Sequence, residues 1–268
     1  TGPPTSPPVP HVTTGPPLQT LDSDCSKSNP TSHHLNTTTH METKHKLTIH
    51  ETPFGHPMYS DVYSPKPEAD LPTVLFFGGS VSKEVYHLRS MSFPENLFSS
   101  FKTEFSDVPA KLITIPCPYG QIEHDDGAIE CMKNVLMDFL KQSNTAPHSI
   151  RAIIGNSRGS YWAVGVAPYF TQTKTLITIA GAGMTLALKE VPRKQHPDSV
   201  HCFANDNDHL RNMTLAFVDT LQKAGVTHSL TTRAGGHAFS DYEKNGSASE
   251  AFQKAVVACR QSTSSTQA

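Results

Sequence analysis

One serine in this chain stands in a sequence context that suits a nucleophile. Ser157 lies at the centre of the stretch Gly155-Asn156-Ser157-Arg158-Gly159, which fits the pattern G-x-S-x-G. In a nucleophile elbow the serine occupies a strained turn between a strand and a helix, and the two glycines let these elements approach each other. The same pattern also arises in ordinary Gly-rich turns, so its meaning depends on the elements around it.

The residues on either side of Ser157 predict the required setting. The apolar run over 149–155 predicts a buried strand, and residues 158–169 predict a helix. Further strands are predicted over 45–51, 58–64, 73–80, 110–116, 174–183, 199–205 and 226–233. Further helices are predicted over 93–105, 127–142, 209–225 and 247–260.

The order of these elements indicates an α/β fold. Short strands that alternate with helices favour βαβ units, in which a parallel sheet is covered by helices on both faces. The first two strands are separated by a short Gly-His-Pro break and are expected to pair as a hairpin. We therefore expect one folded domain with a mostly parallel central sheet.

With these elements in place, the chain resembles the α/β-hydrolase superfamily, the group of serine esterases and lipases. The resemblance covers about Leu47 to Ala258. It implies a triad in the chain order Ser, then Asp or Glu, then His, with each residue on a loop that follows a strand. Many members insert a cap domain between the sixth and seventh strands. Only about 17 residues, Gly183 to Ser199, are available there, so we expect no large cap domain.

The resemblance places the catalytic base after the last strand. Three histidines lie beyond the strand that ends near Asn205, namely His209, His228 and His237. His209 is expected to open a helix and His228 to lie within a strand, which leaves His237. The stretch "GGHAF" around His237 resembles the histidine loop of the family, most closely that of dienelactone-hydrolase-like members.

The acid is expected directly after the strand 199–205, where Asp206 and Asp208 both stand. In the family the acid commonly follows a strand-ending glycine by three residues, and Asn205 can take that glycine's place because Asn tolerates left-handed backbone. This spacing selects Asp208, and "FANDNDHL" also resembles the acid loop of cutinase-like members. The glycine itself is missing, so Asp206 stays an alternative. Either aspartate could instead cap the following helix.

The resemblance also implies an oxyanion hole made of two backbone N–H groups. One belongs to Arg158, which follows the serine, and the other to Gly79 or Ser80 in the loop "FFGGSVS". Phe77 stands where this type of loop usually has His. That difference affects a supporting side chain and leaves the backbone donors in place.

Composition divides the chain into a folded part and two tails. Residues Thr1 to His40 contain no Phe, Trp or Tyr and hold eight of the 21 prolines, so they offer little apolar surface to bury. We expect residues 1–43 to form a disordered Pro/Thr/Ser/His-rich tail, residues 44–260 a catalytic domain, and residues 261–268 a flexible C-terminal tail.

Charge and cysteine usage exclude several classes of function. The formal net charge is −2 with acids and bases interspersed, so nucleic acid is not an expected partner. No apolar run approaches the ~18 residues that span a bilayer. The five cysteines show no CxxC spacing, and no metal site or cofactor is expected.

No signal peptide is visible in the sequence. The cellular location stays open, with the cytoplasm favoured, and the oligomeric state stays open too.

Together these patterns predict a serine hydrolase that cleaves carboxylic esters. Ser157, His237 and Asp208 would act through an acyl-enzyme intermediate on a small-molecule ester or acyl substrate. The alternatives are a thioesterase or peptidase that uses the same residues, and a catalytically silent binding module with the same fold.

Overall fold

The computed structural model describes residues 43–66, 68, 70–81, 86, 95–119, 127–190 and 197–263. Most of the predicted N-terminal tail, residues 1–42, lies outside the described residues, as do residues 264–268 of the predicted C-terminal tail. Among the described residues, no helix combines the length and the apolar character needed to cross a bilayer.

Eight strands form one mixed sheet in the order β1-β2-β4-β3-β5-β6-β7-β8. Their bounds are β1 Thr43–Ile49, β2 Met58–Ser64, β3 Thr73–Phe77, β4 Lys111–Ile115, β5 Ile150–Asn156, β6 Thr175–Ile179, β7 Ser199–Asn205 and β8 His228–Arg233. The pairs β1–β2 and β2–β4 are antiparallel, whereas β4, β3 and β5 to β8 are parallel to their neighbours. The mostly parallel sheet with an antiparallel start is therefore confirmed.

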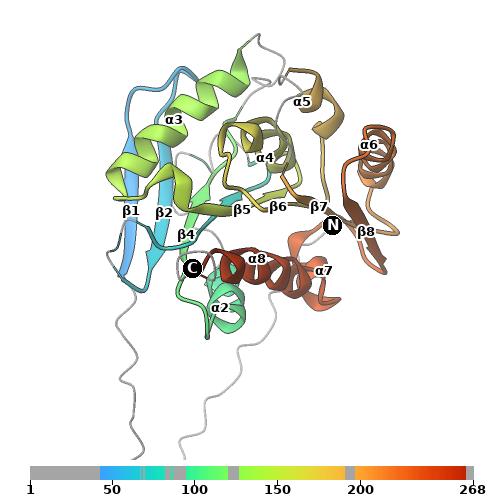
Figure 1. The fold of residues 1–268 in the computed structure, drawn as a ribbon. Helices are drawn as coiled ribbons and strands as arrows, with labels where there is room; N and C mark the ends of the chain where they lie inside the picture. The colour runs from blue at the N-terminus through green and yellow to red at the C-terminus, as the bar shows by residue number, and fades with distance from the viewer. Residues whose placement is uncertain are drawn as a thin grey trace, which may run out of the picture. The chain divides into compact units, whose positions relative to one another are not determined.

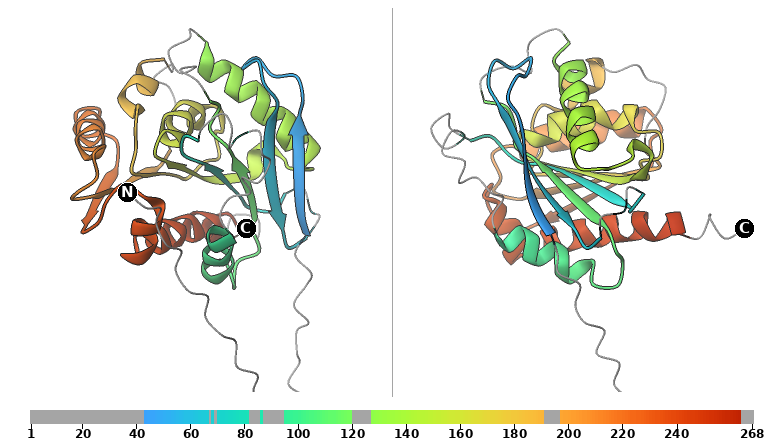
Figure 2. Two further views of the ribbon diagram at one scale, coloured as in Figure 1. Left: turned by 180° about the vertical axis from the view of Figure 1, so that it is seen from behind. Right: turned by 90° about the vertical axis from the view of Figure 1, so that its left-hand side faces the viewer.

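Helices cover both faces of this sheet (Figures 1 and 2). The helix bounds are α2 Glu95–Glu104, α3 Ala128–Gln142, α4 Gly159–Val166, α5 Met184–Glu190, α6 Arg211–Lys223, α7 Phe239–Lys244 and α8 Ser247–Thr263, with short 3-10 turns at Pro147–Ser149 and Ala167–Tyr169. Helices α3, α4, α5 and α6 lie on one face, and α2, α7 and α8 lie on the other. The right-hand view of Figure 2 shows the sheet from its edge between the two layers.

Alternating side chains of the central strands build a core on each face. In β3, Leu75 and Phe77 pack in the core under α3 and α4, while Val74 and Phe76 pack in the core under α2 and α8. All five residues of β3 are buried. A strand buried on both faces is rich in apolar residues on both sides, which is why Val74 to Phe77 form a continuous apolar run.

Several helices differ from the sequence-based expectation. Helices α5 and α7 were not predicted, because six or seven residues are too few to show a helical period. Helix α8 continues to Thr263, three residues beyond Arg260, and neither Gly nor Pro stands there to end it. Helix α6 begins at Arg211 and not at His209. Between β6 and β7 the described residues hold only α5, which agrees with the expected lack of a large cap.

Candidate active site

Ser157 occupies a left-handed turn between β5 and α4. Its φ is +51°, a conformation that non-glycine residues adopt only at a cost of about 1–3 kcal/mol. Two backbone hydrogen bonds hold the turn: the Ser157 N–H donates to the Ile179 carbonyl at 2.8 Å, and the Ala182 N–H donates to the Ser157 carbonyl at 3.1 Å. The end of β6 and the loop after it thus fix the position of the serine.

The two glycines of the motif stand where no side chain fits. A Cβ atom on Gly155 would lie 2.5 Å from Cα of Ser160, in the first turn of α4. A Cβ atom on Gly159 would lie 2.4 Å from the carbonyl oxygens of Phe77 and Gly78. Strand β5, helix α4 and the loop after β3 therefore converge on Ser157 at distances that only glycine allows.

His237 reaches Ser157 from the loop between β8 and α7. Its Nε2 lies 3.0 Å from Oγ of Ser157, within hydrogen-bond distance. Buried Asn205, at the end of β7, holds this loop through a hydrogen bond from its side-chain amide to the Gly236 carbonyl at 3.0 Å. A Cβ atom on Gly235, whose φ is +147°, would lie 2.6 Å from that amide nitrogen. The glycines before His237 thus permit the loop to pack on Asn205.

Asp208 lies behind His237, with its Oδ1 2.9 Å from Nδ1 of the ring. Its side chain is fully buried, and Oδ1 also accepts a hydrogen bond from the Leu210 N–H at 2.8 Å. The Tyr242 hydroxyl donates to Oδ2 at 2.6 Å. Burial alone would raise the pKa of the Asp208 carboxyl, but the hydrogen bonds from Tyr242, Leu210 and His237 hold this pKa below its ordinary value. Asp208 is thus stabilised as a buried carboxylate.

Asp206 contacts the backbone of the loop that carries His237. Its Oδ1 accepts a hydrogen bond from the Gly235 N–H at 3.1 Å, and its own N–H donates to the Arg233 carbonyl at 2.9 Å. The structure therefore brings Asp208, and not Asp206, against the imidazole of His237. Neither aspartate caps α6, because the N-cap residue of this helix is Leu210, whose N–H donates to Asp208.

The loop after β3 lies directly against the serine. A Cβ atom on Gly79 would be 3.2 Å from Cβ of Ser157, and the Gly78 N–H donates to the Ile115 carbonyl at 2.9 Å, which fastens the loop to β4. Ser80 follows as an exposed residue. Arg158 follows the serine and stands at the N-cap position of α4.

Two residues near the site were missed by sequence reasoning. Tyr242 is fully buried and joins Asp208 to the end of β7, because its hydroxyl also accepts the Asn205 N–H at 2.9 Å. His209 precedes α6, and the centroid of its ring lies 4.3 Å from that of His237. No spacing pattern in the sequence links these residues to the serine, because their contacts depend on the unpredicted helix α7 and on the turn before α6.

One group of three side chains among the described residues could hold a metal ion. Each of Asp208, His209 and His237 offers one ligand atom, and these atoms lie within 4.8 Å of one another. The sequence had predicted no metal site, and this group overlaps the proposed triad.

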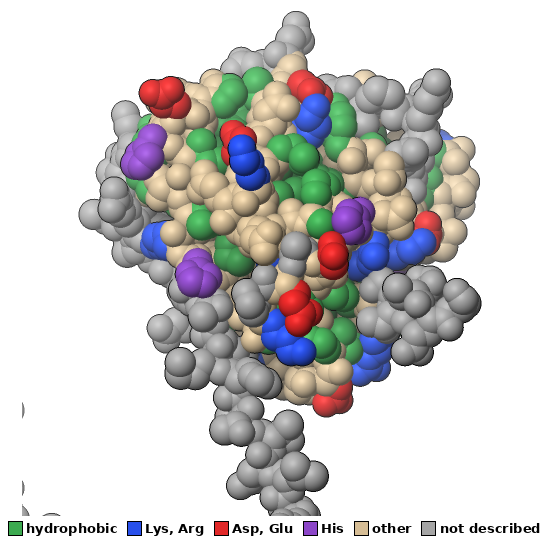
Figure 3. Space-filling model, turned by 60° about the vertical axis from the view of Figure 1, so that its left-hand side comes forward, with side chains coloured by type: hydrophobic (Ala, Val, Ile, Leu, Met, Phe, Trp, Pro, Cys, Tyr) green, Lys and Arg blue, Asp and Glu red, His purple; other side chains and the backbone are tan. Residues whose placement is uncertain are grey.

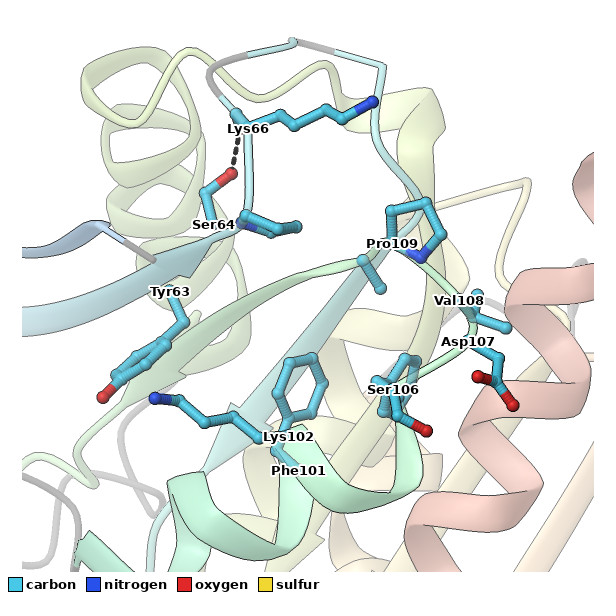
Figure 4. Close-up of a pocket in the computed structure, with 12 residues that line it drawn as sticks. Tyr63, Ser64, Lys66, Phe101, Lys102, Ser106, Asp107, Val108 and Pro109 are labelled. Carbon is cyan, nitrogen blue, oxygen red and sulfur yellow. Dashed lines mark hydrogen bonds between the residues drawn. The ribbon is translucent and has the colours of Figure 1, made fainter. Parts of the chain in front are cut away.

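A separate pocket (Figure 4) lies where the parallel strands begin, at the end of the sheet opposite Ser157. It has a volume of about 270 Å³, and its lining includes Tyr63, Phe101, Lys102 and Pro109. The Lys102 ammonium lies 5.3 Å from the centroid of the Tyr63 ring. Pro109 precedes β4, whereas Ser157 follows β5, and these strands run parallel on either side of β3. The pocket is thus remote from the serine.

Charged side chains are mixed on the face shown in Figure 3, where acidic and basic groups lie next to one another. That face shows no stripe of one charge among the side chains that the structure describes. The arrangement agrees with the interspersed charges of the sequence.

Comparisons with known proteins give structural matches alone. No protein-family model matches the sequence, and no curated protein is similar to it. Carboxyl esterase 2 of the fungus Tuber melanosporum superposes with a TM-score of 0.60 at 15% identity, over 84% of this chain and 89% of the esterase. An S-formylglutathione hydrolase of Staphylococcus aureus superposes with a TM-score of 0.59 at 15% identity, over 80% and 96% of the two chains. A hyperthermophilic esterase of Pyrobaculum calidifontis gives 0.57 at 14% identity, over 82% and 86%.

Proposed function

We propose that this chain, which has the α/β-hydrolase fold, is a serine hydrolase that cleaves carboxylic esters of small molecules. The observation that carries the proposal is the line of contacts from Oγ of Ser157 to Nε2 of His237 at 3.0 Å, and from Nδ1 of His237 to Oδ1 of Asp208 at 2.9 Å. The serine at the head of this line stands on a strained left-handed turn, as in a nucleophile elbow.

Each residue has a distinct task in the reaction. Oγ of Ser157 attacks the ester carbonyl carbon while Nε2 of His237 accepts its proton. The C–O bond of the ester then breaks, and the same proton passes from His237 to the departing alcohol. A water molecule, deprotonated by His237, attacks the acyl-enzyme, and release of the acid restores the serine hydroxyl.

Asp208 prepares the histidine for this task. A carboxylate that accepts the Nδ1–H of His237 leaves the Nε2 lone pair facing the serine, and its negative charge stabilises the imidazolium that forms. The burial of Asp208 and its hydrogen bonds from Leu210 and Tyr242 support this role, because they fix the orientation of an ionised group.

The oxyanion of the tetrahedral intermediate is assigned to backbone donors. We place it between the N–H of Arg158, at the start of α4, and the N–H of Gly79 or Ser80. The close approach of Gly79 to Cβ of Ser157 supports this placement, because the loop reaches the side of the serine where the carbonyl oxygen would lie.

Hydrolysis of p-nitrophenyl esters of graded chain length tests the proposed function. The wild-type protein is expected to turn over short esters, with rates that fall from butyrate to palmitate, because the residues between β6 and β7 are too few to enclose a long chain. Ser157→Ala should abolish turnover, whereas Ser106→Ala, an exposed serine next to the remote pocket, should keep it. Full activity of the Ser157→Ala protein would contradict the proposal, and turnover of thioesters or peptides alone would redirect it to those substrates.

A further inference from the structure

We propose that a transition-metal cation of the Zn²⁺ type binds to Asp208, His209 and His237 and reversibly blocks the reaction. This inference rests on the proposed function for the block, but the binding site stands on geometry alone. The side chains form a mixed group of one carboxylate and two imidazoles whose ligand atoms lie within 4.8 Å of one another.

The distances within this group fit a tetrahedral cation. Oδ1 of Asp208 lies 2.9 Å from Nδ1 of His237 and 3.8 Å from Nδ1 of His209. Zn²⁺ bound at about 2.1 Å in tetrahedral geometry places neighbouring ligand atoms about 3.4 Å apart, between these two values. The His209 side chain is 68% exposed, so it can rotate toward the cation without disturbing the core.

The hydrogen bonds around Asp208 leave room for the cation on Oδ1. Oδ2 is engaged by the Tyr242 hydroxyl, and one side of Oδ1 is engaged by the Leu210 N–H. The remaining position on Oδ1 faces Nδ1 of His237. A cation that takes this position replaces a single bridging proton, while the other two hydrogen bonds of the carboxylate persist.

The block follows from the tautomer of His237. When the cation binds Nδ1 of the neutral ring, the ring proton moves from Nδ1 to Nε2. Nε2 then carries a hydrogen and has no lone pair with which to accept the proton of Ser157. The serine loses its base, although the substrate site itself stays open.

The two imidazole ligands predict which cations inhibit the reaction. Imidazole nitrogens suit Zn²⁺, Cu²⁺ and Ni²⁺, whereas Mg²⁺ and Ca²⁺ prefer oxygen ligands alone. ZnCl₂ is therefore expected to inhibit ester hydrolysis and EDTA to restore it. MgCl₂ at the same concentration should have no effect.

Replacing His209 tests the site, and His148 offers a matched control. The side chains of His209 and His148 are both 68% exposed. His148 pairs with Asp70 at 3.1 Å and precedes β5, so it lies at the end of the sheet opposite Ser157. Loss of a group that merely supports a metal ligand costs about 10–100-fold in affinity, so loss of a ligand should cost at least as much. His209→Ala is therefore expected to raise the Zn²⁺ concentration for half inhibition at least tenfold, and His148→Ala to leave it unchanged.

Isothermal titration of the full-length chain with ZnCl₂ separates this inference from the proposed function. The histidines of the first 42 residues are present in every variant, so the comparison isolates His209. The wild-type and His148→Ala proteins should bind Zn²⁺ at this site at least tenfold more tightly than the His209→Ala protein, whether or not esters are hydrolysed. Equal Zn²⁺ affinity of all three proteins, or equal inhibition of all three, would overturn the inference and leave the proposed esterase activity intact.

Discussion

The hydroxyl of Tyr242 lies 2.6 Å from Oδ2 of Asp208, on the side of the carboxylate away from His237. Both residues are buried, and the same hydroxyl accepts the N–H of Asn205 at 2.9 Å. A residue of α7 thereby holds the proposed acid in place and helps to keep it ionised. We regard Tyr242 as a positioning residue, because it contacts Asp208 and not the serine.

The variant Tyr242→Phe tests this relationship. Removal of the hydroxyl leaves Oδ2 of Asp208 without this donor, and a hydrogen bond to a charged group is worth about 1.5–3 kcal/mol. If about half of that energy is lost in the transition state, kcat falls about 4- to 13-fold. KM should not change, because an interaction that acts on the triad alone affects kcat. Tyr63→Phe removes a hydroxyl beside the remote pocket and should leave kcat unchanged. A raised KM with wild-type kcat would contradict the assignment.

The two neighbouring aspartates give a matched pair of variants. Asp208→Asn should lower kcat by about 10³–10⁴, the size of the loss known for the triad aspartate of a serine protease, because Asn favours the wrong His237 tautomer. Asp206→Asn retains an oxygen that can accept the Gly235 N–H, so its loss should be far smaller. Steady-state kinetics of both proteins check this expectation. The reverse order of the two losses would identify Asp206 as the acid.

Gly159→Ala tests the close packing around the serine. The new Cβ atom would lie 2.4 Å from two backbone oxygens of the loop after β3, and backbone cannot give way as a side chain can. Overpacking of this kind typically costs about 1–3 kcal/mol and displaces the loop that carries Gly79. We expect a lower unfolding midpoint in urea together with a large loss of kcat/KM.

A control for Gly159 is Gly225→Ala, at the end of α6. Gly225 has a φ of +69° but no atom within 4 Å of an added Cβ, so only backbone strain of about 1–2 kcal/mol is expected. This variant should lose stability and keep kcat/KM. Wild-type kcat/KM in Gly159→Ala would show that the tight approach does not position the serine.

Lys111→Met tests a stabilising contact that is separate from the chemistry. The ammonium of this buried lysine donates to the carbonyls of Ser143 and Asn144 and to Oγ1 of Thr145, at the end of α3. Loss of these bonds removes a buried donor from the Thr145 hydroxyl and from two carbonyls, at a cost of about 2–4 kcal/mol in the free energy of unfolding. Urea denaturation measures this loss of stability. The kinetic constants should not change, because Lys111 is the first residue of β4 and lies at the end of the sheet opposite Ser157.

The surface pair of Lys133 and Glu130 serves as the comparison for Lys111. Lys133→Met breaks an ion pair on one side of α3 in which Glu130 is half exposed, and such pairs contribute about 0–1 kcal/mol. If Lys111→Met proves no more destabilising than Lys133→Met, the buried ammonium is not what anchors the end of α3.

Much of the fold could be predicted because the sheet demands a distinctive sequence. The central strands β3, β4 and β6 are buried along their whole length, so each is rich in apolar and β-branched residues and is followed within two residues by Gly or Pro. The turn at Ser157 could also be anticipated. Gly155 and Gly159 stand there for a steric reason that leaves a pattern in the sequence.

The rest of the site depends on contacts that leave no such pattern. The choice between Asp206 and Asp208 is a matter of turn geometry after β7, where both carboxylates make specific hydrogen bonds. Tyr242 reaches Asp208 only because a six-residue helix, α7, turns it inward. His209 was expected to open a helix, but the chain turns first and α6 begins at Arg211.

If Ser157 is an activated nucleophile, it should react covalently with a fluorophosphonate. A fluorophosphonate reacts with a serine whose proton is accepted by a base, and it leaves a stable phosphonyl group on Oγ. After incubation, digestion and mass spectrometry, we expect one phosphonyl group on the peptide that contains Ser157, and none on the Ser157→Ala protein. Absence of labelling in the folded wild-type protein, or labelling of a different residue, would contradict it.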